Sequence, residues 1–296
     1  MFEKAYLLFP LLAGFLYALG ALGLNSASRL GVDSLRAVVA CNVGTALAFL
    51  AFFDWSSFPV LPAPLWPILL QGLLFVSGQL FTILAVSTGE ISSVGPVFGI
   101  KVIFVGFLTA WVFGVPVDGF TWLAAVLSVA GIACLQVTDR PYAFRANALA
   151  IVYAFFAAAS FAGFDAMTQY WSPILGFGRL VPPAIVLATL LSLFFLFRRR
   201  QGRRNLSPRA WRDLTLGAGF FTLQAVVLIR SIGVYGDAAG ANVAYSVRGL
   251  WGILLVWWIG SWFGNAELAA RSPRVLQARI AGAVLVCAAT ALVFWH

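Results

Sequence analysis

Long apolar runs separated by short polar segments dominate this sequence. A helix that crosses the hydrocarbon core of a bilayer needs about 20 mostly apolar residues. Ten runs of suitable length lie between breaks made by charged residues, Gly, Pro or Asn, at residues 5–24, 34–53, 65–87, 92–113, 119–137, 147–168, 179–197, 211–233, 238–262 and 277–295. The pattern therefore predicts an all-α membrane protein with ten transmembrane helices.

The composition agrees with this prediction. Hydrophobic residues make up 62% of the chain and charged residues 10%, whereas a soluble domain has about 45–50% and about 25%. The longest polar stretch, Arg198–Arg212, is too short for a separate soluble domain. Cys41, Cys134 and Cys287 stand alone in apolar runs without metal-ligand spacing, so we expect no cofactor and no metal.

The basic residues predict an orientation in the membrane. The net charge is +9, but most Lys and Arg residues lie in short loops, where orientation signals belong, so we expect no nucleic-acid partner. Fourteen of them flank the odd-numbered loops, and only Lys4 and Arg179 lie on the other side. The positive-inside rule then places the odd loops in the cytoplasm and both termini outside a cell (inner) membrane.

The five-helix pattern occurs twice, which predicts two repeats at residues 1–137 and 138–296. A shift of 147 residues aligns the third and fourth spans with the eighth and ninth, and matches Gly89 with Gly236, Glu90 with Asp237, Lys101 with Arg248 and Trp111 with Trp258. A shift of 140 residues places Asn25 on Asp165. Because five is an odd number, the second repeat must enter the membrane from the opposite side, as in many secondary transporters.

Lys101 and Arg248 stand in the middle of predicted spans. A basic residue at the centre of a membrane helix costs about 2.5–3.5 kcal/mol on insertion scales, so such residues usually face a cavity or a partner. Each base lies eleven residues from the acid at its hairpin tip, which is about 16 Å along a helix and close to half of the bilayer core. We therefore expect both bases at one central site that attracts an anion.

The chain resembles the drug/metabolite transporter superfamily, in its ten-helix EamA-type branch. The resemblance rests on the duplication, on the two tight hairpins, and on the segments GEISSVGPVFGIKVIFVGFLTAWVFG at 89–114 and GDAAGANVAYSVRGLWGILLVWWIG at 236–260. It implies an alternating-access carrier of small metabolites. Phosphate exchangers of that superfamily hold the anion with basic residues on the fourth and ninth helices, and Lys101 and Arg248 match this placement.

Other polar residues inside the spans complete the predicted site. Asp165 and Asn25, near the ends of their spans, are candidates to bind substrate, and Asp165 is also a candidate partner for a proton or for Arg248. Arg230 suggests an outer gate or vestibule, unless it extends to the surface or pairs with Asp237. Three further residues are expected to line the cavity, although helix–helix hydrogen bonding also explains them: Tyr245, Asn242 and Gln79. Glu90 and Asp237 are expected to cap helices.

These features predict a secondary active transporter rather than an enzyme, because no catalytic constellation is found. The expected partner is a small anion, a carboxylate or a phosphate compound that could be a lipid phosphate, together with membrane lipids and either a proton or a counter-substrate. Two alternatives remain. An exporter of neutral or aromatic amino acids would use Arg248 for the carboxylate and Asp165 for the amine, and a flippase would carry an anionic lipid.

Overall fold

The computed structural model describes residues 4–57, 64–88, 91–137, 148–198, 206–259 and 272–295. Within these ranges the regular structure is helical and contains no strand. Eight helices are long and apolar enough to cross a membrane: Ala5–Arg29, Trp66–Thr88, Val94–Val112, Ala148–Leu175, Phe177–Phe197, Pro208–Tyr235, Ala238–Val256 and Pro273–Trp295. Two shorter apolar helices, Ser34–Leu50 and Gly119–Leu135, accompany them in this part of the chain. The helices indicate a multi-pass membrane protein, as the sequence predicts.

The described elements are helices and short helical turns. In order they are η1 (Ala5–Leu7), α1 (Leu8–Arg29), α2 (Ser34–Leu50), η2 (Trp55–Ser57), α3 (Trp66–Thr88), α4 (Ile91–Gly99), α5 (Lys101–Phe107), the π-helical turn η3 (Leu108–Val112), α6 (Gly119–Leu135), α7 (Ala148–Leu175), α8 (Phe177–Arg198), α9 (Pro208–Tyr235), α10 (Ala238–Tyr245), α11 (Arg248–Ile259) and α12 (Pro273–Trp295).

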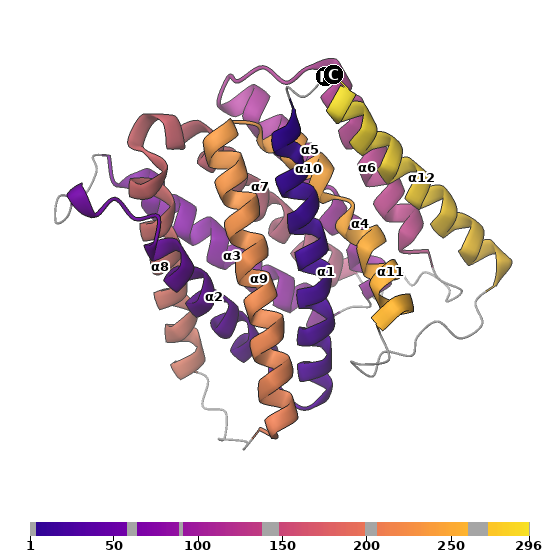
Figure 1. The fold of residues 1–296 in the computed structure, drawn as a ribbon, viewed down its shortest axis with the longest axis horizontal. Helices are drawn as coiled ribbons and strands as arrows, with labels where there is room; N and C mark the ends of the chain where they lie inside the picture. Colours follow the sequence, from indigo (N-terminus) through magenta and orange to yellow (C-terminus); the bar gives the residue numbers. More distant parts are fainter. Residues whose placement is uncertain are drawn as a thin grey trace.

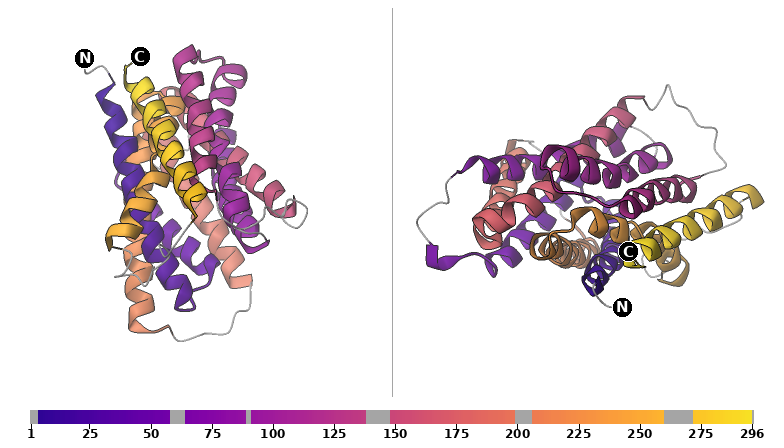
Figure 2. Two further views of the ribbon diagram at one scale, coloured as in Figure 1. Left: turned by 90° about the vertical axis from the view of Figure 1, so that its right-hand side faces the viewer. Right: turned by 90° about the horizontal axis from the view of Figure 1, so that it is seen from above.

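The helices form a bundle whose two edges are helix pairs. Figure 1 shows α6 beside α12 at one edge, and α2 near α8 at the other. Between them α1 packs along α9 and α3 packs along α7. The start of α1 and the end of α12 lie at the same end of the bundle in the side views (Figures 1 and 2). We call this the terminal end.

The predicted fourth and ninth spans each contain a short turn that interrupts the regular α-helical pattern, although Ile100 and Ser246 keep right-handed helical backbone angles. The first is divided at Ile100 between α4 and α5, and the second at Ser246 and Val247 between α10 and α11. Lys101 and Arg248 are therefore each the first residue after a break. Pro96 lies in the turn of α4 before the first break, where it removes a backbone donor from the helix.

Gly14 allows α1 to run directly against the second break. A Cβ atom at this position would lie 3.3 Å from both the Arg248 nitrogen and the Tyr245 carbonyl oxygen. Such contacts are tighter than a side chain normally accepts, so the missing side chain determines how closely α1 approaches. α1 therefore lies against the part of the chain that carries Arg248.

The tight hairpin between α9 and α10 is built as predicted. Gly236 has a φ of 67°, and its N–H group bonds to the Ile232 carbonyl and ends α9. The Asp237 carboxylate then accepts a hydrogen bond of 2.8 Å from the Gly240 N–H group and begins α10. The capping role predicted for Asp237 is confirmed. Its predicted counterpart, Gly89-Glu90, lies outside the described residues.

Candidate functional site

Lys101 forms an ion pair with Asp165 inside the bundle. The Lys101 Nζ atom lies 2.7 Å from the Asp165 Oδ2 atom, and the two side chains are 12% and 4% exposed. The Asn242 amide donates a second hydrogen bond of 2.8 Å to the same oxygen. The ion pair joins α5 to α7, and the Asn242 hydrogen bond adds α10. A buried charge is tolerated when it is both paired and hydrogen-bonded, and both conditions are met here.

This pairing answers a question that the sequence leaves open. Asp165 could neutralise either Lys101 or Arg248, and it contacts Lys101. Its predicted position near the end of a span was wrong, because α7 continues to Leu175 and places Asp165 well inside the helix. The predicted span ends at residue 168, but Gln169 and Ser172 are buried in the bundle and the helix continues through them.

Arg248 is held by aromatic rings instead of by an acid. Its guanidinium carbon lies 4.4 Å from the Tyr245 ring centroid and 5.2 Å from the Tyr17 ring centroid. Among the described residues it makes no ion pair. Aromatic faces attract a cation but do not neutralise it. Arg248 is therefore a partly exposed positive charge in the bundle that no acid of the described residues compensates.

The rings around Arg248 come from helices of both halves of the chain. Tyr17 on α1 contacts Phe221 on α9 at 4.9 Å and Tyr245 on α10 at 6.0 Å between ring centroids. Tyr245 is 5% exposed. A guanidinium group keeps its positive charge and offers a planar set of N–H donors that fits a carboxylate or a phosphate. The arrangement can bind an anion beside an aromatic surface.

The remaining predicted residues do not join this cluster. Gln79 and Asn42 exchange two side-chain hydrogen bonds, of 2.6 and 2.9 Å, so the helix-packing explanation holds for Gln79. Asn25 is exposed one turn before the end of α1. Arg230 is also exposed, with its guanidinium carbon 4.6 Å from the Phe52 ring centroid, and it makes no ion pair with Asp237 in the described structure.

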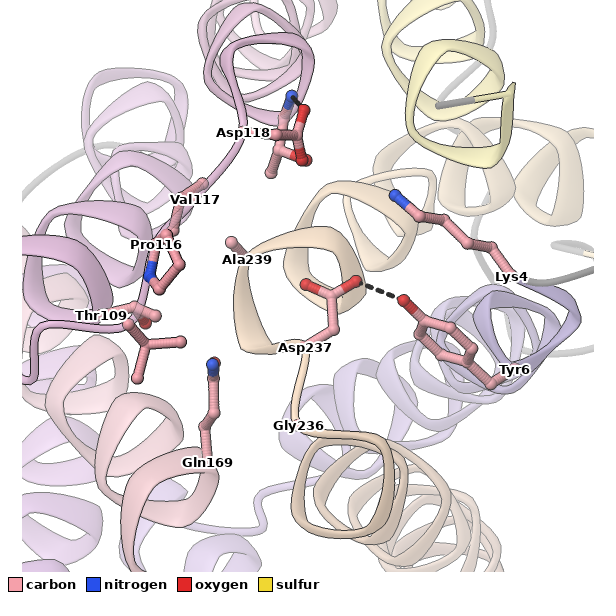
Figure 3. Close-up of a pocket in the computed structure, with 12 residues that line it drawn as sticks. Lys4, Tyr6, Thr109, Pro116, Val117, Asp118, Gln169, Gly236, Asp237 and Ala239 are labelled. Atoms are coloured by element: carbon pink, nitrogen blue, oxygen red, sulfur yellow. Dashed lines mark hydrogen bonds between the residues drawn. The ribbon is translucent and has the colours of Figure 1, made fainter.

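The structure has a cavity at its terminal end, away from the two bases. It encloses about 210 Å³, and Figure 3 shows its walls. Its lining residues are Lys4, Tyr6, Thr109, Val115, Pro116, Val117, Asp118, Thr121, Gln169, Gly236, Asp237 and Ala239. The eight residues predicted to bind substrate are all absent from this lining.

Gln169 links the cavity to the ion pair. Its side-chain oxygen accepts a hydrogen bond of 2.8 Å from the Ala238 N–H group, and the Ala238 carbonyl accepts one of 2.9 Å from Asn242, which contacts Asp165. Sequence reasoning missed Gln169. The signal was present, because Gln169 follows Asp165 by four residues and so shares its helix face.

Comparisons with known proteins support the fold alone. No family model matches the chain, and no curated protein matches its sequence. A solved structure described only as "Crystal structure of protein" superposes with a TM-score of 0.72 over 98% of each chain, at 15% identity. The chain is thus similar over its whole length to an experimentally observed fold.

Proposed function

We propose that this chain is a secondary transporter that moves a small anionic metabolite by alternating access. The observation that carries the proposal is Arg248, a cation within the bundle that no described acid compensates, beside a break in its helix. A net positive charge in a region of low dielectric attracts an anion strongly. Transporters commonly bind substrate at interrupted helices near the membrane midplane, and Lys101 stands at the matching break.

The packing supports a ten-helix bundle made of two inverted repeats. We count the divided helices α4–α5 and α10–α11 as one span each, and α2 and α6 as spans. The counterparts in the two halves are then α1 and α7, α2 and α8, α3 and α9, and α6 and α12. If each helix is replaced by its counterpart, the α1–α9 contact becomes the α7–α3 contact and the α3–α8 contact becomes the α9–α2 contact, and all four are present. The edge pairs α2–α8 and α6–α12 are unchanged by this replacement. Such a correspondence is expected for a duplicated carrier whose halves rock against each other.

The burial of α10 and α11 suggests which side is closed. Every residue of α10 is buried, whereas Arg248 and the residues up to Ile253 are partly exposed. At the terminal end, the Tyr6 hydroxyl donates a hydrogen bond of 2.7 Å to Asp237, and Gln169 binds Ala238. With the termini outside, as the charge distribution predicts, these contacts support a carrier that is closed to the exterior in this conformation.

The ion pair favours a carboxylate over a phosphate as the ligand. Asp165 compensates Lys101, so Arg248 is left as a single positive charge. One guanidinium group balances one carboxylate, whereas a phosphate monoester carries up to two charges at neutral pH. A second candidate, an exporter of neutral or aromatic amino acids, gains support from the same observation and from the rings at Tyr17 and Tyr245. The amine would then have to displace Lys101 from Asp165.

The proposal is tested by uptake into proteoliposomes. We expect uptake of a radiolabelled carboxylate identified by screening, and we expect Arg248→Gln and Lys101→Gln to abolish it. Arg230→Gln is the matched control, because Arg230 is a basic residue within a candidate span that makes no contact with the cluster. Unchanged uptake in both Arg248→Gln and Lys101→Gln would contradict the proposed site.

A further inference from the structure

The cavity at the terminal end contains polar groups that no described residue satisfies. The Thr109 side chain is 2% exposed, and its hydroxyl has no hydrogen-bond partner in the described part of the chain. Gln169 is 7% exposed, and its only recorded hydrogen bond uses its oxygen, which leaves its NH₂ group for the cavity. Buried polar groups without partners are rare and call for an explanation. A ligand bound in the cavity would give the Thr109 hydroxyl and the Gln169 NH₂ group a hydrogen-bond partner.

The backbone around Thr109 is also unusual. Thr109 lies in the π-helical turn η3, and its carbonyl accepts a hydrogen bond from the Val115 N–H group beyond the end of that turn. π-helical turns are rare in proteins and are found frequently at functional sites. The turn places Thr109 in the wall of the cavity, on the side that faces Gln169 and Ala239 (Figure 3).

The charges of the cavity select the ligand class. Its lining carries two carboxylates, Asp118 and Asp237, and one ammonium group, Lys4, so the charged groups sum to −1. Burial acts to raise the pKa of Asp118, but hydrogen bonds from the Thr121 hydroxyl and N–H group and the nearby Lys4 hold the pKa below its usual value. Asp118 is therefore ionised at neutral pH. The excess negative charge favours a cation over an anion.

We propose that this cavity is a second binding site, separate from Arg248, for a compact primary ammonium compound that also carries a polar oxygen. The ammonium group binds Asp237, whose carboxylate already accepts hydrogen bonds from Tyr6 and Gly240 and retains further acceptor capacity. The ligand oxygen accepts hydrogen bonds from the Gln169 amide and the Thr109 hydroxyl. A volume of about 210 Å³ limits the ligand to a small molecule.

The cavity also joins parts of the protein that a transport cycle would separate. Thr109 and Asp118 belong to the first half of the chain, while Gln169 and Asp237 belong to the second. A ligand that contacts both halves stabilises the conformation in which they meet, because it binds that conformation and not the separated one. Occupancy of the cavity should therefore hold the terminal end closed. Binding itself does not depend on the transport proposal.

The test is a titration of the purified full chain with ethanolamine in detergent at neutral pH and constant ionic strength. We expect saturable binding and a rise in Tm, since a ligand of the native state stabilises it by mass action. Ethylene glycol, which lacks the ammonium group, and glycolate, which replaces it with a carboxylate, should produce neither effect. Equal effects of ethylene glycol, or no effect of ethanolamine, would overturn the proposal.

Three variants locate the binding in the cavity. Asp237→Asn keeps one side-chain oxygen to cap α10, replaces the oxygen that accepts from Tyr6 by an NH₂ group and removes the charge, and should weaken ethanolamine binding about tenfold or more. Thr109→Val removes one hydroxyl at nearly constant size and should weaken it about fivefold. Lys4→Gln removes the competing cation and should strengthen binding about two- to fivefold. A purely structural role for Lys4 would not produce tighter binding.

Two controls separate this site from the rest of the protein. Asp33→Asn alters another helix cap, at the start of α2, and should leave the affinity for ethanolamine unchanged. Arg248→Gln should also leave it unchanged, even if that variant no longer transports an anion. Loss of ethanolamine binding in Arg248→Gln would place the amine at the central site, and retained binding in Asp237→Asn would place it outside the cavity; either result overturns the proposal.

Discussion

Lys101 and Asp165 meet inside the bundle with 2.7 Å between Nζ and Oδ2. This contact changes the electrostatics of the two basic residues that stand at the helix breaks. It compensates one of them and leaves Arg248 without an acidic partner among the described residues. Both helices are interrupted just before a basic residue, but only Lys101 has an acidic partner among the described residues.

The ion pair should couple the stability effects of substitutions at its two residues. Asp165→Asn leaves Lys101 as an unpaired buried charge, and we expect the free energy of unfolding to fall by roughly 3–5 kcal/mol. Lys101→Met combined with Asp165→Asn removes both charges and should cost less than the sum of the single changes. The coupling is measured by comparing the free energies of unfolding, in detergent, of the native protein, Asp165→Asn, Lys101→Met and the double variant. Strictly additive effects would show that the contact does not persist in the membrane protein.

Arg248→Lys should separate charge from geometry at the central site. The lysine keeps the positive charge but loses the planar fork that binds a carboxylate with two hydrogen bonds. We expect weaker binding of the transported anion than in the native protein, but measurable binding, whereas Arg248→Gln should show none. Anion titrations of the two variants provide the comparison. Equal affinity of Arg248→Lys and the native protein would mean that the fork makes no contact with the anion.

Gly14→Ala should destabilise the fold through the second helix break. The added Cβ atom would lie 3.3 Å from backbone atoms of Arg248 and Tyr245, so α1 must move away. We expect a loss of about 1–3 kcal/mol in the free energy of unfolding. Gly219→Ala is the matched control, because nothing lies within 4 Å of a Cβ there and alanine favours a helix by up to about 1 kcal/mol. A loss of the same size at Gly219 would refute the steric explanation.

Gln79→Leu should affect stability and leave ligand affinity unchanged. It deprives Asn42, which is 1% exposed, of both side-chain hydrogen bonds. An unsatisfied buried amide costs about 1–3 kcal/mol. Replacing Asn42 by Leu as well should recover part of the loss, since both polar groups are then gone. Thermal unfolding, with and without the transported anion, tests this role. A change in the affinity for the anion would show that Gln79 contributes to the binding site and would contradict this prediction.

The sequence predicts the helices well because apolar run length follows directly from bilayer thickness. Pro96 indicates an interruption of the fourth span about one turn before Lys101, and a break is found there. The sequence does not predict the break before Arg248, because the surrounding run remains apolar and only the approach of α1 at Gly14 marks it. Lys101 and Arg248 stand out in the sequence by their cost in a membrane. Their partners depend on which helices lie side by side, and pattern analysis does not supply that contact.

The cavity illustrates the same limit at the other end of the bundle. Thr109 and Gln169 are ordinary residues in membrane helices, where helix–helix hydrogen bonding usually accounts for them. Their position in a cavity wall is seen only in the folded protein, where α7, η3 and the α9–α10 hairpin come together (Figure 3). Asp237 was identified by sequence as a cap, and this role is confirmed. Its place in a cavity wall requires the assembled structure.

The central claim is that Arg248 is the uncompensated charge that binds an anion. A thermal-shift screen of the purified protein against carboxylates, phosphates, phosphorylated sugars and amino acids tests it most directly, because a ligand of the native state raises Tm. We predict that a carboxylate raises the Tm of the native protein and of Arg230→Gln, and leaves the Tm of Arg248→Gln unchanged. An anion that stabilises Arg248→Gln as much as the native protein would contradict the account.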